Sequence, residues 1–429
     1  MNQSLIKTVK DYAIPFNLDD SLTTLIEEIG EAKIVLLGEA SHGTSEFYSI
    51  RSALSKRLIK EKGFTIIAVE GDWPASQKVN RYIKGYEENA KDAKDAKDAK
   101  EVLNAFNRWP TWMWANEEIA DLVEWLRLYN LGNTTEQKVG FYGIDIYSLW
   151  ESMEEVLQYL SRTEQDGVDL ELAKKAFSCF EPFNRNPENY AISSLHFSDV
   201  CVDEVAKLLT SIRSHEEHYP DDEEADLNLK VNALVTKNAE KYYRAMVQND
   251  ALSWNIRDEH MVETIHELLS YYGEDAKILI WEHNTHIGDA SATDMKEAGM
   301  INVGQLMREQ HQEEEVYAVG FGTYCGTVIA ADRWGSPFEE IDVPPAQSGS
   351  FEDVLHQTGA FDKILFFTDQ NRHLFDDCIG HRAIGVVYNP EYEAYGNYVP
   401  SKIGSRYDAF IYIDQTKALV PLETSNPLT

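Results

Sequence analysis

The chain has 429 residues, and its 39 Lys and Arg against 73 Asp and Glu give a formal net charge of −34. Such an excess of negative charge argues against nucleic acid or an anionic membrane as a partner. Apolar residues make up 43% of the chain and aromatic residues 11%, which excludes an intrinsically disordered protein. At about 150 residues per domain, the length fits roughly three domains or one large α/β domain with insertions.

The sequence contains no run of 18 or more apolar residues, and its first residues lack the basic-then-apolar order of a signal peptide. We therefore expect a cytoplasmic protein without a membrane span. The four cysteines, Cys179, Cys201, Cys325 and Cys378, form no CxxC pair. This spacing argues against a disulfide framework or a zinc-thiolate site, and we expect buried thiols.

Short runs of β-branched and aromatic residues, each ending in polar or glycine residues, recur along the chain. They predict buried strands over residues 33–38, 65–70, 139–145, 277–282, 316–322, 364–367, 384–388 and 409–414. Between the first two runs, residues 45–62 carry apolar side chains at helical spacing, which predicts a βαβ unit.

Between residues 146 and 272 the apolar residues keep helical spacing, and no strand-like run interrupts them. We therefore predict an α/β fold with a central, mostly parallel sheet, helices on both faces and a helical cap insertion. The catalytic core would be residues 1–145 and 273–429, and the cap residues 146–272. The Lys-Asp-Ala repeat over 91–100 is interpreted as a surface insertion.

Polar residues gather directly after four of the predicted strands. These residues are Glu39, Ser41 and His42 after the first, Glu70 and Asp72 after the second, Asp145 after the third, and Glu282, His283 and His286 after the fourth. The carboxyl ends of parallel strands meet at one edge of a sheet, where open α/β sheets bind ligands. The sequence therefore predicts one pocket lined by histidines and carboxylates.

Histidine suits general base work because its ordinary pKa of about 6.5 leaves a neutral fraction near pH 7. Glu39 or Glu70 would fix the tautomer of His42. Arg257 would stabilise an oxyanion or bind a carboxylate, although the simpler expectation from the residue alone is a surface ion pair. The simpler expectation for Arg51 is a salt bridge with a nearby acid. The remaining nine histidines, His381 among them, are expected to be ordinary structural residues.

Two other chemistries follow from the same residues. A nucleophilic serine is poorly supported, because the chain has no G-x-S-x-G motif. A metal site is better supported, since Glu39, His42, Glu70, Asp72, His283 and His286 offer nitrogen and oxygen ligands for zinc or manganese. Their spacing matches no specific metalloenzyme motif. Of Trp109, Trp112 and Trp114, at least one is expected to be a core residue, with the wall of a ligand site as the alternative.

Seven segments carry a further signal. They are GEASHGTSEFY with the following Arg at 38–51, VEGDW at 69–73, PTWMWANEE at 110–118, FYGIDIYSL at 141–149, NIRDEHM at 255–261, WEHNTHIG at 281–288 and YDAFIYIDQTKALVPL at 407–422. In these segments the chain resembles the erythromycin esterase family, some of whose members are named succinoglycan biosynthesis proteins. The segments keep their order over almost the whole chain.

The resemblance implies hydrolysis of a macrolide lactone or another bulky ester by an activated water, without a covalent enzyme intermediate and without a cofactor or metal. By that similarity His42 is the general base, and Glu39, Arg51 and Glu70 surround it. Arg257 and His283 orient the substrate or stabilise the oxyanion, with His286 as a further orienting residue. The resemblance also implies a small-molecule partner and a role in antibiotic resistance.

Two alternatives stay open: a metal-dependent hydrolase that uses the same His and Glu residues, and a non-enzymatic protein that binds haem or a glycan precursor. Glu282 departs from the family pattern, in which a small residue is expected. An extra carboxylate beside His283 would raise the pKa of that histidine, recruit a metal or disfavour an apolar macrolide.

Overall fold

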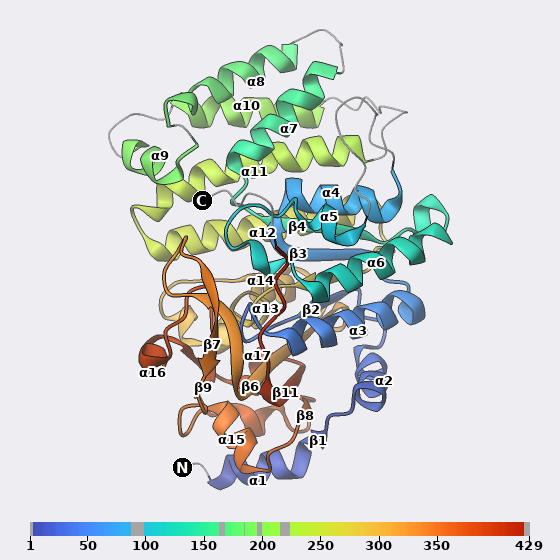
Figure 1. Cartoon of the computed structure of the whole chain (residues 1–429), viewed down its shortest axis with the longest axis vertical. Coiled ribbons are helices and arrows are strands. Elements are labelled where there is room, and N and C mark those ends of the chain that lie inside the picture. The colour runs from blue at the N-terminus through green and yellow to red at the C-terminus, as the bar shows by residue number, and fades with distance from the viewer. Residues whose placement is uncertain are drawn as a thin grey trace. The chain divides into compact units, whose positions relative to one another are not determined.

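The computed structural model describes residues 3–86, 98–162, 168–183, 185–194, 200–214 and 224–423 (Figure 1). The chain divides into two compact units. The first contains Met1–Ala68, Arg81–Gly140 and Ala276–Thr429, and the second contains Val69–Asn80 and Phe141–Asp275. The predicted division into a core and a cap over 146–272 stays a prediction.

The first unit is built around a sheet. Its strands, two of which continue into the second unit, are β1 (Ile14–Pro15), β2 (Ile34–Leu37), β3 (Ile66–Asp72), β4 (Gly140–Asp145), β5 (Ile278–Trp281), β6 (Val316–Ala331), β7 (Phe338–Val343), β8 (Lys363–Phe366), β9 (Ile379–Arg382), β10 (Tyr398–Ser401) and β11 (Ala409–Thr416). Its helices are α1 (Gln3–Tyr12), α2 (Leu18–Ile29), α3 (Ser45–Lys62), α5 (Ala99–Leu103), α6 (Glu117–Leu131), α13 (Asn284–Ile287), α14 (Val303–Gln310), α15 (Phe351–Gln357), α16 (Glu393–Gly396) and α17 (Ile403–Arg406).

The sheet of the first unit is mixed and mostly parallel, with strand order β1-β8-β11-β6-β2-β5-β3. Strand β2 pairs in parallel with β5 and β6, and β11 pairs in parallel with β6. Strands β8 and β7 run antiparallel to their neighbours β11 and β6. The predicted α/β fold is thus confirmed. Because β5 lies between β2 and β3, the crossover helix α3 passes over an intervening strand, whereas the βαβ prediction gave adjacent strands.

Helix α3 shows why the sequence folds this way locally. Acidic Glu46 lies in its first turn and basic Lys60 and Lys62 in its last, so that each charge complements the helix dipole. Gly63 ends the helix in the left-handed conformation, and its backbone N–H donates to the carbonyl of Leu58. The helix bounds agree with the range 45–62 predicted from apolar spacing.

The predicted strand over 384–388 is wrong. Its backbone divides between two partners, because Ile384 N donates to Ala40 O at 2.8 Å while Tyr388 N donates to Ala331 O at 3.0 Å. It forms only isolated bridges, and the nearby strand is β9, which pairs with β10. The sequence also gave no signal for β7, because five of its six side chains are exposed or half-buried and no apolar run marks it.

The described residues of the second unit beyond β4 form helices and turns. The helices are α7 (Leu149–Arg162), α8 (Val168–Ser178), α9 (Pro187–Ser194), α10 (Val200–Ser214), α11 (Ala225–Met246) and α12 (Asp250–Tyr272), and α4 (Trp73–Lys84) continues into the first unit. Side chains such as Val156, Phe180, Leu208 and Leu234 form one buried apolar cluster among these helices. The helical spacing predicted for residues 146–272 therefore agrees with the part of that segment that the structure describes.

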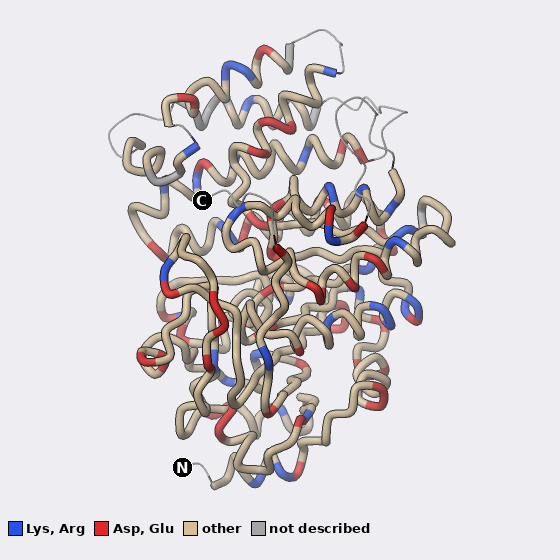
Figure 2. The backbone as a smooth tube through the Cα atoms, viewed as in Figure 1, with Lys and Arg blue, Asp and Glu red and all other residues tan. Residues whose placement is uncertain are grey.

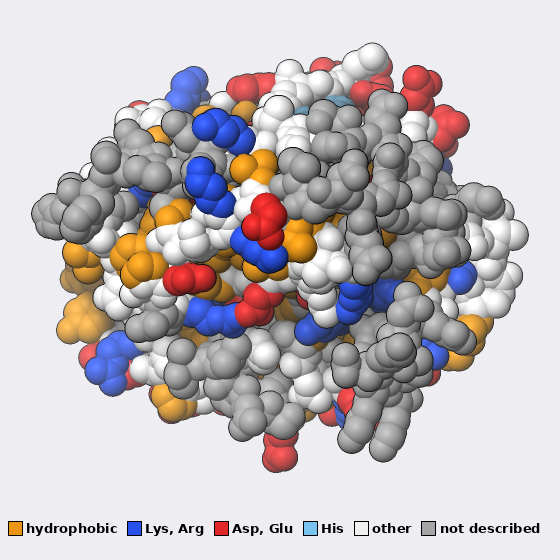
Figure 3. Space-filling view, turned by 90° about the horizontal axis from the view of Figure 1, so that it is seen from above, with side chains coloured by type: hydrophobic (Ala, Val, Ile, Leu, Met, Phe, Trp, Pro, Cys, Tyr) orange, Lys and Arg blue, Asp and Glu red, His pale blue; other side chains and the backbone are white. Residues whose placement is uncertain are grey.

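Charged residues are spread along both units rather than gathered in one block of the chain (Figure 2). On the face drawn in Figure 3, acidic and basic side chains of the described residues stand among apolar ones. Within the described residues, no helix is long and apolar enough to cross a membrane.

The expectation of four buried thiols is wrong. Cys179 is disulfide-bonded, Cys378 is an exposed free thiol and Cys325 is a half-buried one. Burial raises the pKa of the Cys325 thiol, so this group is protonated near neutral pH. Most of the Lys-Asp-Ala repeat, residues 91–97, lies outside the described residues.

Candidate functional site

The carboxyl end of β2 carries a buried Glu–His pair. After β2 ends at Leu37, Glu39 lies 1% exposed and its Oε1 is 2.8 Å from Nδ1 of His42. An anionic carboxylate accepts the hydrogen bond, so Nδ1 of His42 carries the proton and Nε2 keeps its lone pair. His42 is 8% exposed. This tautomer suits a general base that acts through Nε2.

Arg51, on α3, orients the same carboxylate from its other side. Its Nη2 donates to Oε2 of Glu39, and its guanidinium lies over the rings of Tyr48 and Trp281, at 4.5 Å and 4.7 Å from their centroids. Two cation–π contacts and one ion pair hold this cation although it is fully buried. The expected salt bridge of Arg51 is therefore present, and the residue fixes Glu39 rather than facing solvent.

His283 follows β5, which pairs with β2, and its ring centroid lies 4.9 Å from that of His42. It caps the short helix α13, and its Nδ1 accepts from Thr285 N at 3.3 Å. An imidazole that accepts through Nδ1 carries its proton on Nε2. His283 therefore presents a donor where His42 presents an acceptor. We call Glu39, His42, Arg51 and His283 the histidine cluster.

The loop that carries His42 is fixed by backbone hydrogen bonds from segments far away in the sequence. The carbonyl of Ala40 accepts from Ile384 N at 2.8 Å, and the carbonyl of Gly43 accepts from Ile329 N and Leu419 N, both at 3.0 Å. Gly43 is required here because a Cβ at this position would lie 1.9 Å from the carbonyl oxygen of Ile329. The chain therefore has little freedom on either side of His42.

This close approach gives a first prediction. We expect Gly43→Ala to displace the His42 loop, to lower kcat at least tenfold and to reduce the free energy of unfolding by about 1–3 kcal/mol, as overpacking does. Ester hydrolysis and chemical denaturation measure the two effects. Gly396→Ala is the matched control, because a Cβ there meets nothing within 4 Å. Equal effects of the two substitutions would contradict the prediction.

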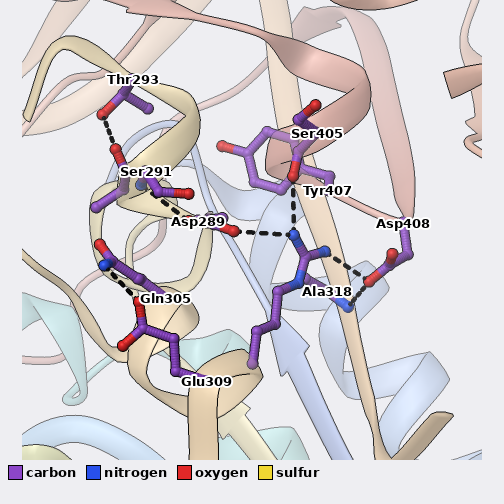
Figure 4. Close-up of polar contacts among 12 residues, drawn as sticks. Asp289, Ser291, Thr293, Gln305, Glu309, Ala318, Ser405, Tyr407 and Asp408 are labelled. Atoms are coloured by element: carbon purple, nitrogen blue, oxygen red, sulfur yellow. Dashed lines mark hydrogen bonds and ion pairs between the residues drawn. The ribbon is translucent and has the colours of Figure 1, made fainter. Parts of the chain in front are cut away.

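A second network of hydrogen bonds and ion pairs holds the segment after His283 in place (Figure 4). Arg308 on α14 lies 3.5 Å from the carboxylate of Asp289, and it donates to the carbonyl of Ser405 at 2.8 Å and to Asp408 at 2.9 Å. Asp408 also accepts from Ala318 N at 2.8 Å, which connects the network to β6. His286 in this segment is 2% exposed, and Glu282, which precedes His283, is 0% exposed.

In the second unit, the predicted site residues Arg257 and Glu70 meet Asp145, a carboxylate at the end of β4. Arg257 on α12 donates through Nε and Nη2 to the two oxygens of Asp145, at 2.9 Å and 2.7 Å, and through Nη2 to Glu70 Oε1 at 2.7 Å. Its guanidinium lies 5.0 Å from the centroid of the Tyr147 ring. Despite the cost of burial, Asp145 and the other neighbours raise the pKa of Arg257. We call Glu70, Asp145, Tyr147 and Arg257 the arginine cluster.

The seven predicted site residues therefore divide between the two units. Glu39, Arg51, His42 and His283 form the histidine cluster and His286 lies close to it in sequence, whereas Glu70 and Arg257 belong to the arginine cluster. That all of them face one pocket stays a prediction. Sequence reasoning missed the packing of Arg51 on the rings of Tyr48 and Trp281. The only hint of it was that both aromatic residues lie in the family-like segments 38–51 and 281–288.

The three tryptophans separate into two kinds. Trp112 and Trp114 are buried, at 0% and 4% exposed, and are core residues. Trp109 is half-buried, packs 4.5 Å from the exposed ring of Trp334 and donates to the carbonyl of Ser336 at 2.9 Å. In the described residues, no group of three or more His, Cys, Asp or Glu is arranged to hold a metal ion.

Comparisons with known proteins agree over most of the chain. The family model described as Erythromycin esterase matches residues 59–416. The chain is 22% identical over 390 residues to erythromycin esterase type II of Escherichia coli, covering 84% of this chain and 88% of that protein. The fold is similar to that of a succinoglycan biosynthesis protein (TM-score 0.77, 19% identity, 98% of each chain). It is also similar to a mutant of the erythromycin esterase EreC in its open conformation (TM-score 0.67, 14% identity, 98% of each chain).

Proposed function

The chain belongs to the erythromycin esterase family of hydrolases, and from this membership we propose that it hydrolyses a bulky ester or macrolide lactone with a water activated by His42. The observation that carries the proposal is the close pair of histidine rings in the histidine cluster, with His42 held by Glu39 at 2.8 Å and the two ring centroids 4.9 Å apart. The tautomers inferred above fit this role. Nε2 of His42 is an acceptor and Nε2 of His283 is a donor, on rings 4.9 Å apart. Such a pair serves water attack on a carbonyl group.

The proposed reaction has two steps. Nε2 of His42 removes a proton from water while the water oxygen attacks the carbonyl carbon, and the Nε2–H of His283 donates to the oxyanion that forms. The tetrahedral intermediate then expels the alkoxide, which takes the proton from His42. Glu39 stabilises the imidazolium between the two steps, and Arg51 keeps Glu39 in position. In this proposed reaction, no side chain forms a covalent bond to the substrate.

We assign the arginine cluster and His286 to substrate orientation. Arg257 holds two carboxylates, which fixes its guanidinium plane, and a fixed guanidinium is suited to orient a carbonyl or hydroxyl group of a ligand. We further propose that residues 146–272 form the cap that encloses the bound substrate. The name of the Escherichia coli relative supports a macrolide as the first substrate, and with it a role in macrolide resistance.

The proposal is tested by following hydrolysis of erythromycin and of a p-nitrophenyl ester, with and without chelator, together with elemental analysis of the purified protein. We expect hydrolysis that chelator leaves unchanged, with no burst of alcohol and no acylated protein in intact mass spectra. A burst with a stable acyl adduct would contradict direct water attack. Stoichiometric metal and loss of activity on chelation would favour the metal-dependent hydrolase instead.

A further inference from the structure

His381 lies outside the proposed reaction, yet it forms a second buried pair of a histidine with a carboxylate. Its Nδ1 is 2.5 Å from Oε1 of Glu352, and both residues are 0% exposed. On its other side, Nε2 lies 3.2 Å from Nδ2 of Asn284, the residue that follows His283. We propose that His381 is a positioning residue for His283, which it orients through the side-chain amide of Asn284. This inference rests on the proposed function.

The hydrogen bonds define the roles of both nitrogens of His381. Glu352 also accepts from the backbone N–H of Arg382 at 3.0 Å, so its Oε1 is an acceptor for two donors. The proton of His381 therefore lies on Nδ1, and Nε2 accepts from Asn284. Burial lowers the pKa of His381, against the opposite effect of Glu352, which favours this neutral form. Arg406 and Arg382 are the nearby cations.

The amide of Asn284 has one orientation that satisfies its neighbours. Its Nδ2 donates to the carbonyl of Phe321 at 2.6 Å, and its Oδ1 accepts from Phe321 N at 3.2 Å. A rotated amide would place its NH₂ group against the N–H of Phe321 and its oxygen against the lone pair of His381. Gly38 leaves room for this amide, because a Cβ there would lie 2.1 Å from Oδ1 of Asn284. His381 and the backbone of Phe321 thus favour the same amide orientation.

The same residue connects both halves of the histidine cluster. The backbone N–H of Asn284 donates to the carbonyl of Glu39 at 2.9 Å, and the carbonyl of Asn284 accepts from Arg406 at 2.9 Å. Glu39 holds His42, and His283 directly precedes Asn284. Movement of Asn284 therefore changes the position of the His283 ring relative to His42. A displacement of about 1 Å in a catalytic group can cost about 10²-fold in rate.

Two substitutions separate positioning from a merely structural role. His381→Gln keeps a polar group near the position of Nε2 and can still accept from Asn284. His381→Asn keeps one near Nδ1 and satisfies Glu352 alone. We expect His381→Asn to lower kcat by about 10–10²-fold with little change in KM, and His381→Gln to stay within a few-fold of the wild type. His356→Asn is the matched control, because His356 lies on the same helix α15 as Glu352 but pairs with a different carboxylate, Asp414, at 2.8 Å.

A measurement without substrate keeps this inference distinct from the proposed function. In NMR spectra of protein with ¹³C-labelled histidine rings, the His283 resonance should move in His381→Asn and stay in place in His381→Gln. If His42→Ala keeps its activity, the proposed reaction fails while the His283 resonance still tests the positioning. Wild-type kcat and an unchanged His283 resonance in His381→Asn would overturn the inference. The inference would also be overturned if both variants lost the same share of kcat and if that loss matched their loss of thermal stability.

Discussion

Replacing His42 by alanine is expected to lower kcat by about 10²–10⁴-fold, the contribution that a general base makes to a reaction of this kind. The variant loses the only proton acceptor that we assign to the attacking water, whereas KM should change little because the substrate contacts remain. His42→Gln tests the same role without leaving a cavity, since its amide cannot accept the proton. Steady-state hydrolysis of a p-nitrophenyl ester and of erythromycin measures both constants.

The control for this prediction is His356→Ala. His356 also pairs with a carboxylate, at 2.8 Å from Asp414, and it stacks on Tyr324 with ring centroids 3.6 Å apart. Because it has no part in the proposed reaction, we expect wild-type kcat from this variant. A His42→Ala enzyme with more than a tenth of the wild-type kcat would refute water activation by His42, whatever the result for His356.

The second large effect is expected from Arg51→Met. Removing this guanidinium leaves the carboxylate of Glu39 buried without its cation, a change that typically costs about 3–5 kcal/mol. The rings of Tyr48 and Trp281 also lose their cation–π contacts with Arg51. We expect a large fall in the free energy of unfolding, measured by chemical denaturation, and a kcat reduced at least tenfold in the fraction that folds.

Two further variants make this result specific. Arg51→Lys keeps the charge but not the planar group, so we expect an intermediate loss of stability. Arg57→Met removes an arginine from the same helix, where it pairs with Glu61 at 2.7 Å on the surface, and such pairs contribute about 0–1 kcal/mol. If Arg57→Met and Arg51→Met lower the free energy of unfolding by the same amount, the buried ion pair of Arg51 with Glu39 stabilises the protein no more than a surface pair does.

Much of the fold could be predicted where burial leaves a local pattern. Residues 34–37 are all buried and read as a strand, and α3 shows an apolar face with suitable charges at each end. The prediction failed where pairing depends on distant partners. Residues 384–388 are as apolar as a strand but divide their hydrogen bonds, and the exposed strand β7 exists because β6 continues beyond residue 322 and pairs with it.

The candidate site could be predicted to a similar extent. His42 and Glu39 are three residues apart, so their contact was within reach of a sequence argument. The contacts of Arg51 with Trp281 and of His381 with Asn284 join residues that are far apart in the chain, and only folding brings them together. The tautomers of His42 and His283 were inferred from their hydrogen bonds with Glu39 and Thr285, whose geometry is visible only in the folded chain. Composition and motifs alone therefore left the metal alternative open.

The loop that carries His42 has one more consequence, for the order of folding. The backbone N–H of Ser45 donates to the carbonyl of Lys417, and the carbonyl of Gly43 accepts from Leu419 N. The residues near position 43 therefore need a segment almost 380 positions later to complete their hydrogen bonds. Contacts of such long range form late, since closing the intervening chain is entropically costly. During synthesis the ribosome must release the chain up to about Leu419 before the histidine cluster is complete. A nascent chain that has already folded its first helices therefore remains inactive.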